Sequence, residues 1–176
     1  PRPQEIRAIY EGHEVAAHTL THPQLVDLSD EEIIHQVEKD RLALSELIGY
    51  EVVGFAYPGS QPNYNEHIVQ LIRENTGIRY ARTTISSLDF LPPQKEELLQ
   101  YHPTVYHHEQ WEMLEKLTDE FIHAPADKPR LFYIWGHSYE FDIHHDWERF
   151  EAILKKLAWH DDIFYGTNRQ VLLDLK

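Results

Sequence analysis

The stretch "GHEVAAHTLTHPQL" (residues 12–25) joins a short apolar run to two histidines spaced four apart. The run at 14–18 suits a buried strand, so "HTLTHP" begins where that strand ends. Pro23 disfavours the α conformation at His22, which predicts a short loop or single turn for His18 and His22. Two imidazoles at this spacing suit one Zn²⁺, whose catalytic sites usually take three protein ligands; two solvated surface histidines suit the spacing equally well.

The rest of the chain alternates predicted strands with predicted helices. A capping box from Ser29 to Glu32 and a closing Gly49 mark the clearest helix. Further helices are predicted at 4–10, 65–75, 109–124, 146–158 and 168–175, and strands at 14–18, 52–57, 78–84, 130–137 and 163–166. This alternation is typical of an α/β fold with a parallel sheet, either open or closed into a barrel. We expect one domain over residues 1–176, with 85–108 as a long connection.

Polar stretches lie at the ends of four predicted strands: "HTLTHP", "PGSQPN" and "GHSYEFD" follow three of them, and "ARTT" ends the other. In both kinds of sheet, loops at the carboxyl ends of the strands share one rim and carry the binding groups. His137 follows an apolar strand and a glycine, so it is either a general acid or a structural histidine at a strand end. Trp135 belongs in the core, unless its ring is exposed near His137 as a sugar platform. The adjacent pairs at 107–108 and 144–145 are predicted to be solvated histidines.

The composition excludes several classes of function. Thirty acidic residues against sixteen basic ones give a formal charge of −14, without a cluster of Lys or Arg, so nucleic acid is not an expected partner. There are no cysteines, so a metal site must use His, Asp or Glu. No run approaches the ~18 apolar residues of a membrane span, and the first residues do not resemble a signal peptide. We expect a soluble chain, and its compartment stays open.

Taken in order, "GHEVAAHTLTHPQL", "GFAYPG" and "LFYIWGHSYEFD" resemble the polysaccharide deacetylases, the NodB-homology group also called carbohydrate esterase family 4. The resemblance implies a distorted (β/α) barrel. It also implies a metal-dependent hydrolase that removes acetyl groups from N-acetylated sugars. The family motif H-[ST]-x-x-H matches His18, Thr19 and His22, which implies that both histidines bind a divalent metal, usually zinc.

Two later family motifs match less closely. Aligning an Arg-x-Pro-Tyr-Gly turn on its proline puts Ala56 in place of the arginine, and Arg82 is our candidate substitute. The Leu-x-His motif corresponds to residues 134–137, which implies that His137 is the general acid and that the same segment forms a wall of the acetyl pocket. The substrate-binding residues predicted in this way are Tyr57, Pro58, Gly59, Arg82 and Trp135.

The family's Asp-Asp motif, which supplies the general base and the third metal ligand, has no counterpart upstream of His18. The pair Asp161 and Asp162 precedes a predicted strand instead of ending one, so we do not assign it that role. The chain therefore resembles a member that lacks its first βα segment, with an incomplete barrel that would favour self-association. The alternative function is a degenerate, non-catalytic module that binds a glycan or another protein.

Overall fold

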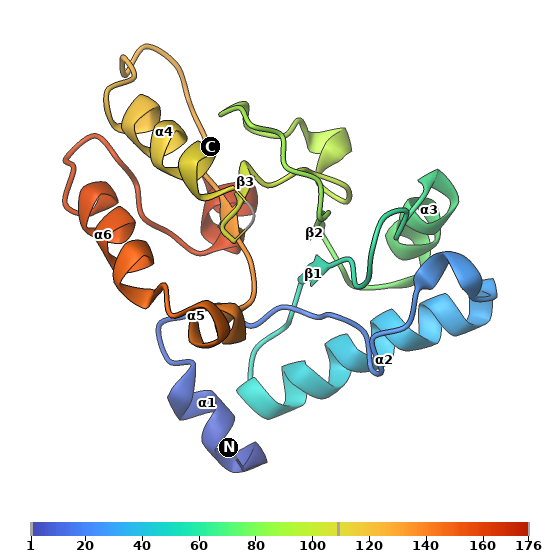
Figure 1. The fold of residues 1–176 in the computed structure, drawn as a ribbon. Coiled ribbons are helices and arrows are strands. Elements are labelled where there is room, and N and C mark those ends of the chain that lie inside the picture. The colour runs from blue at the N-terminus through green and yellow to red at the C-terminus, as the bar shows by residue number, and fades with distance from the viewer. Residues whose placement is uncertain (1, 109, 176) are drawn as a thin grey trace. The chain divides into compact units, whose positions relative to one another are not determined.

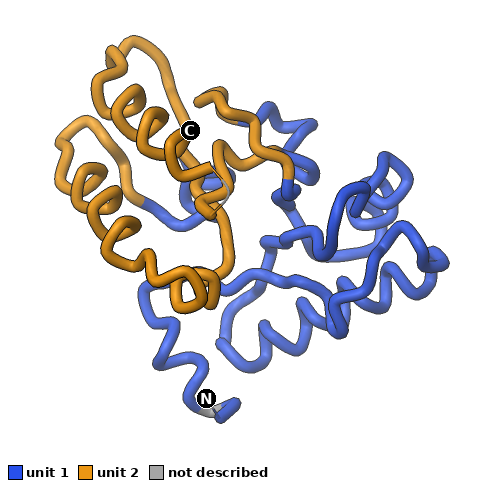
Figure 2. The backbone as a smooth tube through the Cα atoms, in the orientation of Figure 1, with its two compact units in different colours: residues 1–84, 93–101, 166–176 blue, residues 85–92, 102–165 orange. Residues whose placement is uncertain are grey.

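The computed structural model describes residues 2–108 and 110–175, which form two compact units. Unit 1 comprises residues 1–84, 93–101 and 166–176, and unit 2 comprises residues 85–92 and 102–165 (Figure 2). Each unit has helices and short parallel strands of its own (Figure 1). The single domain expected over residues 1–176 stays a prediction.

Helix α2 (Asp30–Ile48) of unit 1 begins and ends where the sequence predicts. The hydroxyl of Ser29 accepts the N–H of Glu32, and the carboxylate of Glu32 accepts the N–H of Ser29 at 2.9 Å. This capping box satisfies two backbone donors that the first turn leaves without helical partners. At the other end Gly49 adopts φ +79°, the left-handed conformation that closes many helices.

The remaining helical segments of unit 1 are shorter. Helix α3 (Glu66–Asn75) begins at Asn65, whose side chain accepts the N–H of Ile68 at 3.0 Å. The helix predicted at 4–10 is present as a 3₁₀ turn followed by a short α-helix, and the helix predicted at 168–175 is mainly a π-helix. The other short helical segments of unit 1 are the 3₁₀ helices η1 (Pro3–Glu5), η2 (Leu25–Asp27) and η3 (Lys95–Glu97), the α-helix α1 (Ile6–Ile9) and the π-helix η4 (Gln170–Asp174).

The sheet of unit 1 is parallel. Strands β1 (Gly54–Ala56) and β2 (Tyr80–Arg82) pair along their whole length. A single parallel bridge joins Ala17 to β1, and another joins Tyr101 to β2. Four segments therefore run in the same direction, and their carboxyl ends lie at one edge of the sheet.

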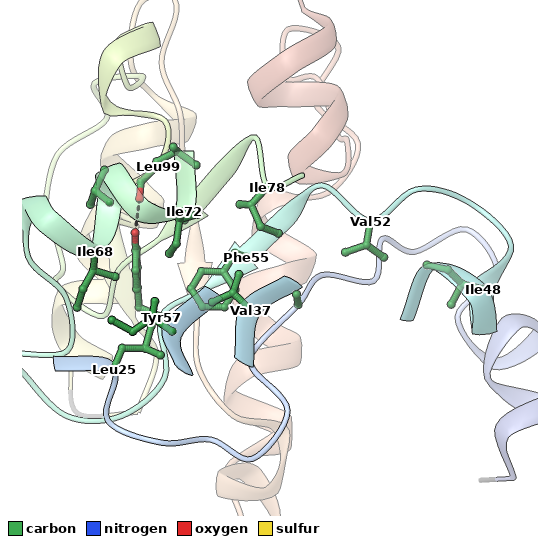
Figure 3. Packing of buried hydrophobic residues seen from close by; sticks show 14 residues of the cluster. Leu25, Val37, Ile48, Val52, Phe55, Tyr57, Ile68, Ile72, Ile78 and Leu99 are labelled. Carbon is green, nitrogen blue, oxygen red and sulfur yellow. Dashed lines mark hydrogen bonds between the residues drawn. The ribbon is translucent and has the colours of Figure 1, made fainter. Parts of the chain in front are cut away.

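The core of unit 1 is built from both strands and from helices α2 and α3 (Figure 3). Tyr57 lies within it, and its hydroxyl donates to the carbonyl of Leu99 at 2.8 Å. That bond satisfies the polar end of an otherwise apolar buried ring. The buried residues of this cluster are Ala17, Leu25, Ile33, Val37, Ile48, Val52, Phe55, Tyr57, Ile68, Val69, Ile72, Ile78, Ala81 and Leu99.

Unit 2 also has a parallel pair of strands, β3 (Val105–Tyr106) and β4 (Ile134–Trp135). Its helices are α4 (Trp111–Ile122), α5 (Ser138–His144) and α6 (Trp147–Leu157). Side chains from β3, α4 and α6 form the core of this unit. They are Val105, Leu114, Leu117 and Ile153.

The strands are shorter than the sequence predicted. The run at 14–18 makes one bridge at Ala17, the run at 130–137 keeps only Ile134–Trp135 as strand, and 163–166 forms no strand. Apolar runs mark burial, whereas a strand also needs a neighbouring backbone to pair with, and that neighbour is not encoded locally. The predicted connection at 85–108 contains β3 and η3.

Helix α5 and the sheets also differ from the expected fold. Helix α5 (Ser138–His144) was not predicted, because the polar loop assigned there continues into a helix. Across the described residues the strands form two two-stranded sheets and no closed one, so the barrel is not confirmed. None of the helices in that part of the chain combines the length and apolarity needed to cross a membrane.

Candidate active site

The loop that carries His18 and His22 leaves the carboxyl end of the bridged segment at Ala17. His18 is half-buried, and its Nδ1 lies 2.7 Å from the carbonyl oxygen of Ala56 at the end of β1. A carbonyl only accepts, so Nδ1 carries the proton and the lone pair of the neutral ring lies on Nε2. This is the arrangement in which a histidine ligates a metal through Nε2, with its other nitrogen held by the backbone.

His22 is exposed and faces the same loop. Its ring centroid lies 4.8 Å from that of His18, with the planes at 71°. The backbone of His22 has φ +55° and that of Thr19 has φ +72°, both in the left-handed region. Non-glycine residues rarely adopt this conformation, and a β-branched threonine least of all, so the loop is held against its local preference. The prediction that Pro23 keeps His22 out of a helix is confirmed.

Helix α2 holds the loop in place. The carboxylate of Asp40 accepts the backbone N–H of His18 at 2.7 Å. Burial raises the pKa of Asp40, and the backbone donors of His18 and Thr19 oppose that rise. Gln36 exchanges two further bonds with Thr21, one from the backbone N–H at 3.1 Å and one to the hydroxyl at 2.9 Å. Together these contacts fix the backbone through which His18 and His22 are presented.

The imidazole nitrogens of His18 and His22 are donor atoms of a type that zinc prefers. Two imidazoles are suitable ligands for Zn²⁺, and the tautomer of His18 is already the ligating one. Within residues 2–108 and 110–175, however, no three His, Asp or Glu side chains gather closely enough to hold a metal. The loop therefore offers two of the three protein ligands that a catalytic zinc site usually has.

The turn after β1 shows where the predicted substrate-binding residues lie. Tyr57 and Pro58 are buried, and the Tyr57 side chain has no surface to offer a ligand. Burial also raises the pKa of Tyr57, consistent with a neutral core phenol. Gly59 is half-buried with φ +81°, and a Cβ there would overlap the side chain of Gln24, so the turn requires glycine.

Arg82 ends β2, one strand away from Ala56. Residues 56 and 82 are paired in the parallel register, and the N–H of Tyr57 donates to the carbonyl of Arg82 at 3.1 Å. The prediction that the loops after these strands share one rim is therefore confirmed for residues 18–22, the turn at 57–60 and Arg82. The fourth loop, with His137, belongs to unit 2.

His137 lies just past β4 and begins helix α5. Its side chain is 41% exposed, and its Nδ1 lies 3.3 Å from Oε1 of Glu140. The ring stacks on that of Tyr139, with centroids 5.2 Å apart. Trp135 is half-buried and stacks on Tyr106 at 4.6 Å, with its centroid 6.0 Å from that of His137. His137 is thus a partly solvated group beside a carboxylate and an aromatic wall, which suits proton transfer.

Sequence reasoning missed two residues beside His137. Glu140 was assigned no role, and His107 was predicted to be solvated. That prediction is wrong, because the His107 side chain is only 2% exposed. Its ring stacks on Phe141 at 4.3 Å, and its Nδ1 lies 3.2 Å from the carbonyl of Trp135. Helix α5, which follows His137, supplies the Phe141 ring that covers His107, and a residue 34 positions away leaves no signal beside the histidine pair.

Comparison with known families gives a match for the N-terminal part of the chain. Residues 2–81 match the family described as "Polysaccharide deacetylase", which confirms the resemblance over that segment. No curated protein matches the chain in sequence. The match includes His18, His22 and the turn after β1, and it ends in β2, so it does not extend to unit 2.

Two solved structures are similar to this chain. PuuE allantoinase matches 97% of this chain with 62% of its own, at a TM-score of 0.73 and 16% identity. At that identity the match shows a shared α/β fold alone. A Streptococcus pyogenes deacetylase, PplD, solved in complex with acetate, matches 57% of this chain with 42% of its own, at a TM-score of 0.47 and 20% identity. The chain therefore spans less than two thirds of the length of either protein.

Proposed function

We propose that this chain, whose residues 2–81 match the polysaccharide deacetylase family, is a metal-dependent hydrolase that removes acetyl groups from N-acetylated sugars. One observation carries the proposal. His18 and His22 lie ring to ring in a strained strand-end loop, and the backbone of β1 holds His18 in the metal-ligating tautomer. A merely solvated pair of histidines has no need for that constraint.

His18 and His22 are the residues that would hold the metal, which we propose to be zinc. A bound divalent ion supplies Lewis acidity to an amide carbonyl and lowers the pKa of water. With two protein ligands instead of three, we expect this chain to bind zinc weakly. The loop contributes orientation, because Asp40 and Ala56 fix His18 from two sides.

Proton transfer is assigned to His137, which would protonate the departing amine nitrogen. This role, and its combination with His18 and His22 in one reaction, comes from the sequence resemblance. Trp135 would line the acetyl group. The backbone at Pro58 and Gly59 would face the developing oxyanion, with Arg82 as the nearby cation. We leave the Tyr57 side chain out of the substrate contacts because it is buried.

The test combines metal binding with activity. Zinc binding is measured by titration calorimetry on wild type, His18→Ala, His22→Ala and His13→Ala, the last being an exposed histidine in the same segment. Acetate release from N-acetylglucosamine oligomers is measured with and without zinc. We expect both loop variants to lose zinc binding and zinc-dependent acetate release, while His13→Ala keeps both.

Zinc binding that survives His18→Ala and His22→Ala would overturn the metal assignment. Zinc binding lost in those variants, with no acetate release from wild type on any oligomer, would instead favour the non-catalytic module. Retention of the oligomers on the immobilised chain would then identify a glycan-binding function.

A further inference from the structure

The carboxylate of Glu140 gathers four groups of unit 2 around it. Its Oε1 accepts the hydroxyl of Tyr106 and lies 3.3 Å from Nδ1 of His137. Its Oε2 accepts the backbone N–H of His137 at 3.1 Å and lies 3.5 Å from Nε2 of His107. The Glu140 side chain is only 12% exposed, so these groups take the place of most of its water.

The protons around Glu140 follow from these contacts. Burial raises the pKa of Glu140, but the donors Tyr106 and His137 outweigh burial and hold that pKa below its usual range. Burial lowers the pKa of His107, against the opposing bond to the Trp135 carbonyl. That carbonyl also places the His107 proton on Nδ1, so the Nε2 lone pair faces Glu140. His107 therefore donates nothing to Glu140, and its Nε2 has no hydrogen-bond partner among the described residues.

We infer that Glu140 is the positioning residue of His137. Nδ1 of His137 is buried and has no formed hydrogen bond among the described residues; Oε1, at 3.3 Å, is the acceptor that we assign to its proton. Oε2 accepts the backbone N–H from which the ring projects. The ring is thereby held with Nε2 directed away from the carboxylate, as the atom that gives a proton to substrate. This inference rests on the proposed function for its catalytic meaning, but the tautomer it requires is independent of any activity.

Other aromatic and charged groups also lie near His137 and His107. Facing His137 are the rings of Tyr106, Trp135 and Tyr139. Facing His107, apart from Glu140, are His108 and the carboxylate of Asp146. Among these groups Glu140 is the carboxylate in contact with His137.

The first arm of the test reads the tautomer by ¹⁵N–¹H correlation spectra of the full chain, with His137→Gln used to assign the signal. In wild type we expect the neutral His137 ring to carry its proton on Nδ1. In Glu140→Gln we expect that preference to be lost, while Asp142→Asn, an exposed acid on the same helix, keeps it. A wild-type ring protonated on Nε2 would overturn the inference, whether or not any variant folds.

The second arm reads kinetics of acetate release. Glu140→Gln should lower kcat by at least about tenfold with KM within about twofold, because the proton donor and not substrate binding is affected. Tyr106→Phe removes one donor but keeps the charge, so its kcat should fall less. Full kcat in Glu140→Gln, with an unchanged tautomer, would sink the positioning role and leave the deacetylase proposal standing. A wild-type protein that has the Nδ1 tautomer but releases no acetate would keep the positioning role of Glu140 and overturn the deacetylase proposal.

Discussion

Nδ1 of His18 lies 2.7 Å from the carbonyl oxygen of Ala56, the residue at which β1 ends. His18 is thus both a candidate ligand and a structural contact between two neighbouring segments of the sheet. His22, in the same loop, is exposed. The two histidines should therefore share a role in metal binding but differ in their effect on stability.

Replacing each histidine by alanine separates these roles. With metal removed by a chelator, His18→Ala should lower the free energy of unfolding by about 1 kcal/mol, because the Ala56 carbonyl loses its donor. His22→Ala should leave it within about 0.5 kcal/mol. Urea unfolding with EDTA present measures both. Equal losses in the two variants would contradict the proposed division.

The left-handed backbone of Thr19 gives a second prediction. Thr19 has φ +72°, and its buried hydroxyl is without a hydrogen-bond partner in the described part of the chain. Thr19→Gly relieves the strain and removes the orphaned hydroxyl, which together exceed the added entropy of the unfolded chain. We expect a gain of about 1 kcal/mol in the free energy of unfolding. Thr21→Gly, which loses the hydroxyl that accepts from the Gln36 amide, should destabilise instead, and a loss at Thr19 as well would refute the argument.

Arg41 gives a pH-dependent prediction for unit 1. Its buried guanidinium donates to both oxygens of Glu38, at 2.8 and 2.6 Å, and to the carbonyl of Val52 at 3.3 Å. The hydrogen bonds from Arg41 lower the pKa of Glu38, with burial opposing them. Because the folded-state pKa is lowered, the stabilisation is complete above the ordinary value of 4.5 and is lost as the pH falls through the lowered value.

Two variants test this pair by urea unfolding between pH 7 and pH 3. Arg41→Ala should cost roughly 3 kcal/mol at pH 7, because Glu38 loses its partner in a largely buried place. Glu38→Gln should be less stable than wild type at pH 7 and should lose less stability on acidification. Parallel pH curves for wild type and Glu38→Gln would show that Glu38 does not contribute to the acid sensitivity.

Features set by interactions between neighbouring residues could be predicted from the sequence, whereas features set by distant residues could not. The bounds of α2 were predictable because Ser29, Glu32 and Gly49 act within one helical turn of its ends. Strand lengths were not, because pairing at Ala17 depends on a backbone 38 residues further along. Spacing was enough to select His18 and His22 as a candidate pair, whose role stays a prediction. Glu140 meets Tyr106 across 34 positions, which no local pattern encodes.

Gly136 supplies the last prediction, for the burial of His107. A Cβ at Gly136 would overlap the imidazole of His107, a buried ring that is also stacked on Phe141. The ring has no room to retreat, so Gly136→Ala should cost about 2 kcal/mol of unit 2 stability, as overpacking does. It should also disturb Glu140, and through it the His137 tautomer.

A double variant distinguishes overlap from a simple backbone effect. His107→Ala alone should be destabilising, because it opens a cavity beside Phe141. In Gly136→Ala/His107→Ala the new methyl enters space that the ring has left, so the combined loss should be smaller than the sum of the single losses by about 1 kcal/mol or more. Thermal unfolding followed by tryptophan fluorescence reports on this region, since the ring of Trp111 lies 5.8 Å from that of His107. Strictly additive losses would mean that the glycine is required for its backbone freedom and not for the space it leaves to His107.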